Sequence, residues 1–212
     1  MSAFSQATFV ASVGRLDQLP PEGVPELVFA GRSNVGKSSA INALANRRRL
    51  AFVSKTPGRT QTINFYELGE HGRLVDLPGY GDARVPQAVR SQWDALIGGY
   101  LKARASLAAA VVIMDARRPF TPQDIAMVEW LAPLGVRLLV LLSKCDKLSR
   151  TERREALTAA RCGLVACGIG GEVMLFSSLT GEGVDQARDL LESWLRDAAR
   201  AAENKRPPVK GI

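Results

Sequence analysis

The chain has 212 residues, of which 46% are hydrophobic, so we expect one domain with short extensions and a substantial core. Lysine and arginine total 28 against 21 aspartate and glutamate, and the pI is about 9.7; this favours an anionic partner such as RNA, although a solvated basic surface has the same composition. The number and spacing of the three cysteines argue against a disulfide scaffold, and the single histidine argues against a histidine-rich metal site. The sequence shows no apolar run of membrane-spanning length and no signal pattern, which argues against a membrane protein. We therefore expect a cytoplasmic monomer.

Residues 1–25 form a lead-in to the main domain. Residues 8–13 (Thr-Phe-Val-Ala-Ser-Val) predict a short edge strand, and residues 19–23 (Leu-Pro-Pro-Glu-Gly) predict a turn-rich linker. We expect the domain itself over residues 26–202 and a basic, disordered tail over residues 203–212.

A phosphate-binding loop follows the first core strand. The apolar residues 27–30 lead into residues 31–38, Gly-Arg-Ser-Asn-Val-Gly-Lys-Ser, which match the pattern G-x-x-x-x-G-K-S. The glycines let the backbone approach a ligand, and the loop N–H groups converge on an anion at a helix start. In this pattern Lys37 reaches the β- and γ-phosphates and the Ser38 hydroxyl binds Mg²⁺. The predicted nucleotide contacts are Gly31, Arg32, Ser33, Asn34, Val35, Gly36, Lys37, Ser38 and Ser39.

A polar loop and a hairpin come next. Glycine, proline and polar residues up to Thr60 predict a mobile loop. Residues 61–68 alternate like a strand, and with the turn at residues 69–72 and the run 73–77 they predict an antiparallel hairpin. This run leads into Asp76-Leu77-Pro78-Gly79, a D-x-x-G pattern. Its carboxylate can hold Mg²⁺ through water, and its glycine N–H can meet a γ-phosphate.

The remaining chain alternates helices and buried strands. Apolar spacing predicts a helix over residues 85–105, with Trp93 in or near the core, and apolar runs at 107–114, 136–142 and 173–176 predict strands. Capping signals at Thr121 and Ser149 begin two helices, and a last helix covers residues 183–202. This order predicts a three-layer, doubly wound α/β fold with a mostly parallel sheet and an antiparallel hairpin strand. Ligands in such folds bind outside the carboxyl ends of the strands.

Two further motifs follow the last two strands, Ser-Lys-Cys-Asp at residues 143–146 and Ser-Ser-Leu at residues 177–179. With the phosphate loop, Thr60 and D-x-x-G, they resemble the signature set of Ras-like P-loop GTPases. The resemblance implies that Asp146 accepts hydrogen bonds from guanine N1–H and its amino group, and that the Lys144 stem packs on the ring. Ser143 replaces the usual Asn or Thr, and Ser178 the usual Ala. The guanine contacts it implies are Ser143, Lys144, Cys145, Asp146, Ser177, Ser178 and Leu179.

More narrowly, the chain resembles the EngB (YihA/YsxC) family of bacterial ribosome-biogenesis GTPases, within the TRAFAC class. The similarity lies in residues 31–39, 55–66 (Lys-Thr-Pro-Gly-Arg-Thr-Gln-Thr-Ile-Asn-Phe-Tyr) and 76–81, with 19–23 and 176–179. It implies binding of GTP and GDP, and Mg²⁺ held by Ser38, Thr60 and, through water, Asp76. It also implies a switch in late assembly of the large ribosomal subunit, with an association with cell division and septation. Further implied nucleotide contacts are Gly58, Arg59, Thr60, Gln61, Thr62, Asp76, Leu77, Pro78 and Gly79.

Hydrolysis of GTP requires positioning and charge stabilisation, for which we expect Lys37, Thr60 and Gly79. Tyr80 stands where Ras-type enzymes keep a glutamine that orients water, so we predict slow intrinsic hydrolysis. An activator can supply the missing group, because an arginine finger contributes roughly 10³–10⁵ in rate. A bound K⁺ with Asn34 as ligand is a second hypothesis, and simple loop geometry explains Asn34 equally well.

Basic clusters predict electrostatic contacts with ribosomal RNA, although a solvated helix face explains each cluster separately. Two other functions remain open. One is a plain P-loop NTPase or kinase, against which Lys144 and Asp146 argue; the other is a nucleotide-gated RNA-binding module with negligible turnover. The candidate RNA contacts are Arg47, Arg48, Arg49, Arg150, Arg153, Arg154, Lys205, Arg206 and Lys210.

Overall fold

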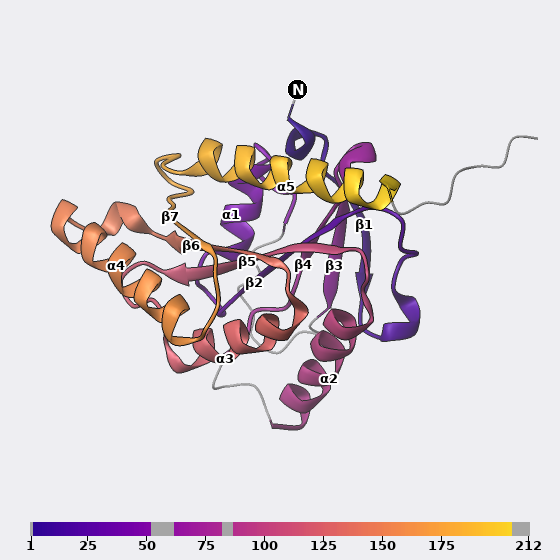
Figure 1. The fold of residues 1–212 in the computed structure, drawn as a ribbon, viewed down its shortest axis with the longest axis horizontal. Helices are drawn as coiled ribbons and strands as arrows, with labels where there is room; N and C mark the ends of the chain where they lie inside the picture. The colour runs from indigo at the N-terminus through magenta and orange to yellow at the C-terminus, as the bar shows by residue number, and fades with distance from the viewer. Residues whose placement is uncertain (1, 52–61, 82–86, 205–212) are drawn as a thin grey trace, which may run out of the picture.

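A computed structural model describes residues 2–51, 62–81 and 87–204, and a sheet covered by helices forms its centre (Figure 1). Within these residues the sheet has seven strands in the order β1-β3-β4-β2-β5-β6-β7. The strands are β1 (Thr8–Val13), β2 (Glu26–Gly31), β3 (Ile63–Glu67), β4 (Arg73–Asp76), β5 (Leu107–Asp115), β6 (Arg137–Ser143) and β7 (Glu172–Leu175).

The sheet is mostly parallel. Strands β4, β2, β5, β6 and β7 run parallel to one another, whereas β3 is antiparallel to both β4 and β1. The β3–β4 pair is the predicted hairpin, with a short 3₁₀ turn (Gly69–His71) between its strands, and β1 is the predicted edge strand. The predicted fold class is therefore confirmed.

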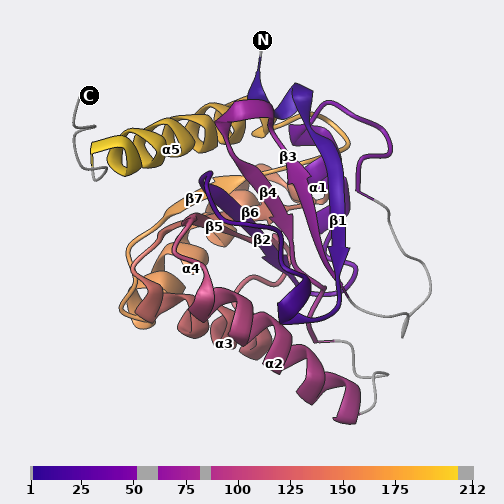
Figure 2. The ribbon, with the colours of Figure 1, turned by 90° about the vertical axis from the view of Figure 1, so that its right-hand side faces the viewer.

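Helices cover both faces of the sheet and complete three layers (Figures 1 and 2). α1 (Lys37–Leu44) and α5 (Val184–Asn204) lie on one face, and α2 (Gln87–Ala103), α3 (Pro122–Leu131) and α4 (Arg150–Ala166) lie on the other. β2 shows how one strand fills both layers. Leu27 and Phe29 belong to the α1–α5 core, whereas Val28 and Ala30 belong to the core beneath α2, α3 and α4, as the two-residue period of a strand requires.

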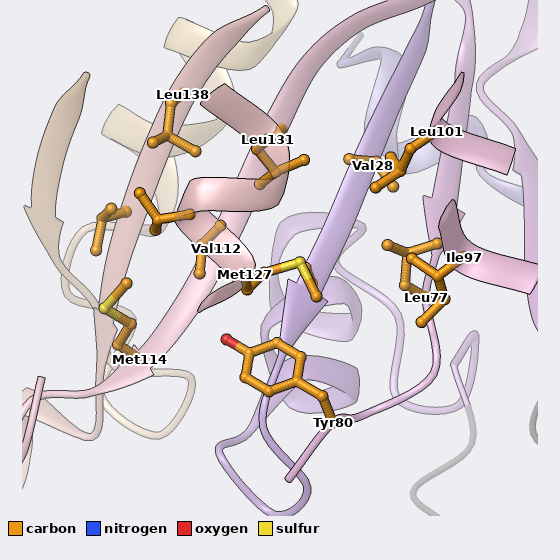
Figure 3. Packing of buried hydrophobic residues seen from close by; sticks show 14 of the residues in the cluster. Val28, Leu77, Tyr80, Ile97, Leu101, Val112, Met114, Met127, Leu131 and Leu138 are labelled. Carbon is orange, nitrogen blue, oxygen red and sulfur yellow. The ribbon is translucent and has the colours of Figure 1, made fainter. Parts of the chain in front are cut away.

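The core beneath α2, α3 and α4 reaches the carboxyl end of β2. Figure 3 shows the ring of Tyr80 extending into this core from the loop after β4, beside Met127 of α3. Tyr80 is 9% exposed. A residue of the predicted nucleotide-handling loop is thus also part of the hydrophobic core.

The helix ends follow the predicted capping signals with two differences in length. Capping boxes begin α3 at Thr121 and α4 at Ser149. α2 ends at Ala103 rather than at residue 105, and α5 continues to Asn204 rather than ending at residue 202. No glycine or proline follows residue 202 until Pro207, so nothing in the sequence stops α5 there.

Several predictions fall outside the described residues. These are the loop that carries Thr60, the side chain of Trp93 and the tail beyond Asn204. In the part of the chain that the structure describes, no helix combines the length and the apolar character that crossing a membrane requires.

Candidate functional site

The phosphate loop joins the end of β2 to the start of α1. A Cβ on Gly31 would lie 2.9 Å from the Ile113 carbonyl oxygen and 2.9 Å from Val35 Cγ1, so only glycine fits there without a shift. Gly36 precedes α1 with a φ of 103°, which L side chains rarely adopt. Because Gly36 has no side chain to cap α1, the first N–H groups of the helix remain available to an anion.

Lys37 and Asp76 form an ion pair across this loop. The Lys37 ammonium contacts Asp76 Oδ1, and the two side chains are 10% and 7% exposed. Lys37 begins α1 and Asp76 ends β4, and the parallel pairing of β4 with β2 brings them together. Asp76 is therefore a buried carboxylate that already holds a cation. That environment fits the Mg²⁺ role predicted for it, and Ser38, the other predicted ligand, directly follows Lys37 in the first turn of α1.

The D-x-x-G loop lies directly on the phosphate loop. The Ser33 N–H donates to the Tyr80 carbonyl at 2.9 Å, and the Tyr80 N–H donates to the Gly31 carbonyl at 3.2 Å. A Cβ on Gly79 would lie 3.2 Å from Ser33 Cα, and the Ser33 hydroxyl is 3.2 Å from the Gly79 carbonyl oxygen. These contacts extend the β2–β4 pairing beyond both strands, so the two loops are mechanically connected.

Ser143 connects the end of β6 to the phosphate loop. Its hydroxyl oxygen lies 2.7 Å from the Val35 carbonyl oxygen and 3.0 Å from the Met114 carbonyl oxygen. Ser143 is 4% exposed, so its hydroxyl must donate within the protein. A serine at this position is therefore sufficient to link the two motifs.

Lys144 makes a second connection between the same segments. Its ammonium donates to the Asn34 carbonyl at 2.9 Å and to Asp115 Oδ2 at 3.0 Å. Burial raises the pKa of Asp115, but hydrogen bonds from Arg117 and Lys144 outweigh burial and hold that pKa below its usual value. Asp115 is therefore an ionised partner that fixes the Lys144 stem at the edge of the site.

Asp146 is held by the loop that follows β7. The Ser177 hydroxyl donates to Asp146 Oδ1 at 2.7 Å and accepts the N–H groups of Leu179 and Thr180 at 3.3 and 3.2 Å. The Ser177 hydrogen bond lowers the pKa of Asp146. Asp146 thus presents an ionised carboxylate, the acceptor that a base with two adjacent N–H donors requires. Ser178 and Leu179 are exposed beside it.

The structure brings most of the predicted site residues to one edge of the sheet. Thr62, directly before β3, instead accepts a hydrogen bond from the Ser12 hydroxyl of β1 at 2.6 Å. Cys145 is fully buried, and burial followed by the nearby Glu182 raises its pKa to about 11, so only its backbone can face a ligand. The predicted residues outside the described part are Gly58, Arg59, Thr60 and Gln61.

Two carboxylates of this edge were missed by sequence reasoning. Asp115 holds Lys144, and the only sequence signal for it was its place at the end of a strand. Asp124 accepts the Tyr80 hydroxyl at 3.0 Å, and the sequence indicated only its capping role. The Tyr80 hydroxyl therefore points toward the start of α3.

A family model and curated relatives identify the family of this chain. Residues 26–144 match the family model described as 50S ribosome-binding GTPase. The chain is 51% identical to the probable GTP-binding protein EngB of Dechloromonas aromatica (strain RCB), over 100% of this chain and 97% of that protein. It is 49% identical to the protein of the same name in Burkholderia cenocepacia (strain HI2424), over 96% of each chain.

Solved structures share the fold. The crystal structure of a probable GTP-binding protein engB aligns with a TM-score of 0.65 at 23% identity, over 81% of this chain and 99% of that one. Era in complex with MgGDPNP and nucleotides 1506–1542 of 16S ribosomal RNA aligns with a TM-score of 0.60 at 17% identity, over 82% of this chain and 57% of that one.

Proposed function

Since this chain belongs to the EngB family of P-loop GTP-binding proteins, we propose that it is a Mg²⁺-dependent GTPase with a slow intrinsic rate. We further propose that it works in the cytoplasm as a monomeric switch in assembly of the large ribosomal subunit, with an associated role in cell division and septation. Family membership is the support for the last of these roles.

The observation that carries guanine recognition is the attachment of the Ser143–Asp146 segment to the phosphate loop. Ser143 and Lys144 donate to carbonyl groups of that loop, so the base-binding and phosphate-binding ends are held at a fixed separation. The ionised Asp146 would accept guanine N1–H and the 2-amino group. Adenine has no such pair of donors, so we propose selectivity for guanine nucleotides.

Lys37 and the free N–H groups of α1 would bind the β- and γ-phosphates. Ser38, Thr60 and, through water, Asp76 would hold Mg²⁺, which would neutralise charge on the phosphates. We expect the Lys37–Asp76 ion pair to separate when Lys37 binds the phosphates. Asp76 would then be free to accept another cation. Nucleotide binding would therefore exchange the partners of these two buried charges.

Tyr80 supports a slow intrinsic rate. Its ring is buried in the core beneath α2, α3 and α4, so the side chain would not orient an attacking water. Gly79 N–H and Thr60 would instead order the loops around the γ-phosphate. An activating partner that supplies an arginine or a water-orienting group would raise the rate.

Potassium dependence is a separate proposal that rests on Asn34. Asn34 has a φ of 63°, and Asn tolerates this left-handed conformation better than most residues, so loop geometry alone also accounts for it. Turnover measured in KCl and in NaCl distinguishes the two explanations. Equal rates in both salts would eliminate K⁺ as a cofactor.

Unpaired arginines support ribosomal RNA as the partner. Arg48 and Arg49 follow α1, Arg150 and Arg154 lie on α4, and all four are exposed without an ion-pair partner among the described residues. Arg153 is not available in the same way, because it donates to both carboxylate oxygens of Glu182 at 3.0 Å. α1, which precedes Arg48 and Arg49, and α4, which carries Arg150 and Arg154, cover opposite faces of the sheet (Figure 2), so we treat the two clusters as separate candidate contacts.

Co-sedimentation with large ribosomal subunits tests the switch. We expect more binding with a non-hydrolysable GTP analogue than with GDP, and a loss of binding as salt increases. Arg154→Glu should weaken binding if the α4 cluster is the contact, with Arg200→Glu on α5 as the charge-matched control. Equal co-sedimentation with the GTP analogue and with GDP would contradict the switch.

A further inference from the structure

The buried carboxylate of Asp124 connects α3 to the phosphate-site loops. Asp124 lies in the first turn of α3 and is fully buried. Its Oδ2 accepts the Thr121 N–H at 3.0 Å and the Thr121 hydroxyl at 2.8 Å, which caps the helix. Its Oδ1 accepts the Arg32 Nε–H at 3.2 Å and the Tyr80 hydroxyl at 3.0 Å. One oxygen therefore serves the helix and the other serves the loops.

Arg32 and Tyr80 are themselves joined through the backbone. They form a parallel β-bridge, supported by the Ser33 N–H on the Tyr80 carbonyl and the Tyr80 N–H on the Gly31 carbonyl. Burial, and then the adjacent carboxylate, raise the pKa of Tyr80, so its hydroxyl remains a donor. Gly79 immediately precedes Tyr80. If Gly79 moves toward a γ-phosphate, we expect the adjacent Tyr80 to move with it and its hydroxyl to leave Asp124.

We propose that Asp124 is a positioning residue that couples the D-x-x-G loop to α3 in a nucleotide-dependent way. The proposal rests on the proposed function, because it requires Gly79 to meet a γ-phosphate. The bond between Asp124 and Tyr80 keeps the loop in its described position, with Gly79 packed against the phosphate loop. GTP breaks this bond, whereas GDP leaves it in place. The environment of α3 therefore changes only when the triphosphate is bound.

Removal of the Tyr80 hydroxyl tests the coupling. Tyr80→Phe keeps the ring in the core, and we expect the affinity for a non-hydrolysable GTP analogue relative to GDP to rise roughly tenfold, the size expected for one hydrogen bond to a charged acceptor. Fluorescent-nucleotide titration with Mg²⁺ measures this ratio. Tyr100→Phe is the matched control, because Tyr100 donates to the buried Glu26 at 2.8 Å at the opposite end of β2. It should leave the ratio unchanged.

The fluorescence of Trp130 provides a second test, because it would not depend on the bound nucleotide if Asp124 only stabilised the fold. It lies on α3 and is 41% exposed, so its fluorescence reports on this helix. Because the chain has three tryptophans, the fluorescence of Trp130 is obtained by subtracting the spectrum of the matching Trp130→Phe variant. We expect this signal to differ between GDP and the GTP analogue in wild type, and to lose that difference in Tyr80→Phe.

The outcomes separate this inference from the proposed function. An unchanged affinity ratio in folded Tyr80→Phe, with both nucleotides still bound, overturns the coupling and leaves the GTPase proposal intact. A wild type that binds neither nucleotide overturns both. If Tyr80→Phe does not fold, Asp124→Asn weakens the same bond and must raise the ratio in the same direction; an unchanged ratio there also overturns the coupling.

Discussion

The Ser143 hydroxyl lies 2.7 Å from the Val35 carbonyl oxygen, so a residue at the end of β6 directly supports the phosphate loop. This contact joins two segments that are more than a hundred residues apart in the chain, since the hydrogen bond spans 108 positions. It explains how the base-recognition and phosphate-binding motifs keep one relative position.

Ser143→Ala should weaken GTP and GDP binding by the same factor. The substitution removes one buried hydrogen bond, worth about 1 kcal/mol or roughly fivefold in affinity, without touching a group predicted to contact phosphate. Titration with both nucleotides measures the effect. Ser143→Thr keeps the hydroxyl and serves as the control. Equal affinities for wild type and Ser143→Ala would show that the contact does not support the loop.

Asp76→Asn should destabilise the nucleotide-free protein strongly. It leaves the Lys37 ammonium without its carboxylate in a site where the lysine side chain is 10% exposed, and breaking such a buried pair costs about 3 kcal/mol. Denaturant unfolding gives the change in free energy of unfolding.

The control for this prediction is an exposed ion pair. Arg137 and Asp197 are 2.8 Å apart with side chains 49% and 51% exposed, so Asp197→Asn should cost less than about 1 kcal/mol. Similar small effects of both substitutions would contradict the buried role of the Lys37–Asp76 pair.

Cys145 should resist alkylation across the neutral pH range. Its pKa is raised to about 11, so the reactive thiolate is rare at pH 8 and increases about tenfold per pH unit up to that value. Cys162 is exposed and should react first. Mass spectrometry of peptides after iodoacetamide treatment at pH 7, 8 and 9 measures both sites. Equal labelling of Cys145 and Cys162 in the folded protein would mean that the segment after β6 is not packed as described.

The fold could be predicted from the sequence because its signals are local. Apolar runs indicated β5 and β6, capping signals indicated the starts of α3 and α4, and the turn after Leu68 indicated the hairpin. The predicted end of α5 at residue 202 was wrong, because polar residues continue a helix when no breaker follows them, and the helix extends to Asn204.

The site was predicted as a set of motifs, but its internal contacts were not. Asp76, the partner of Lys37, ends another strand, and Val35, a partner of Ser143, lies in the phosphate loop. No local pattern indicates which groups parallel pairing will bring together. Asp124 illustrates the same limit. Its capping role accounts for Oδ2, but no local pattern indicates that Oδ1 accepts hydrogen bonds from Tyr80 and Arg32. Arg153 was counted with the RNA contacts because its partner, Glu182, lies after the next strand.

The most direct test of the central claim is the nucleotide preference of Asp146→Asn. An asparagine offers an NH₂ donor group and a carbonyl acceptor in place of two carboxylate acceptors. The variant should therefore lose affinity for GTP and gain affinity for XTP, whose base carries a carbonyl in place of the 2-amino group. We predict that wild type prefers GTP over XTP and ATP, and that Asp146→Asn prefers XTP. An unchanged GTP affinity in the variant would contradict guanine recognition by Asp146.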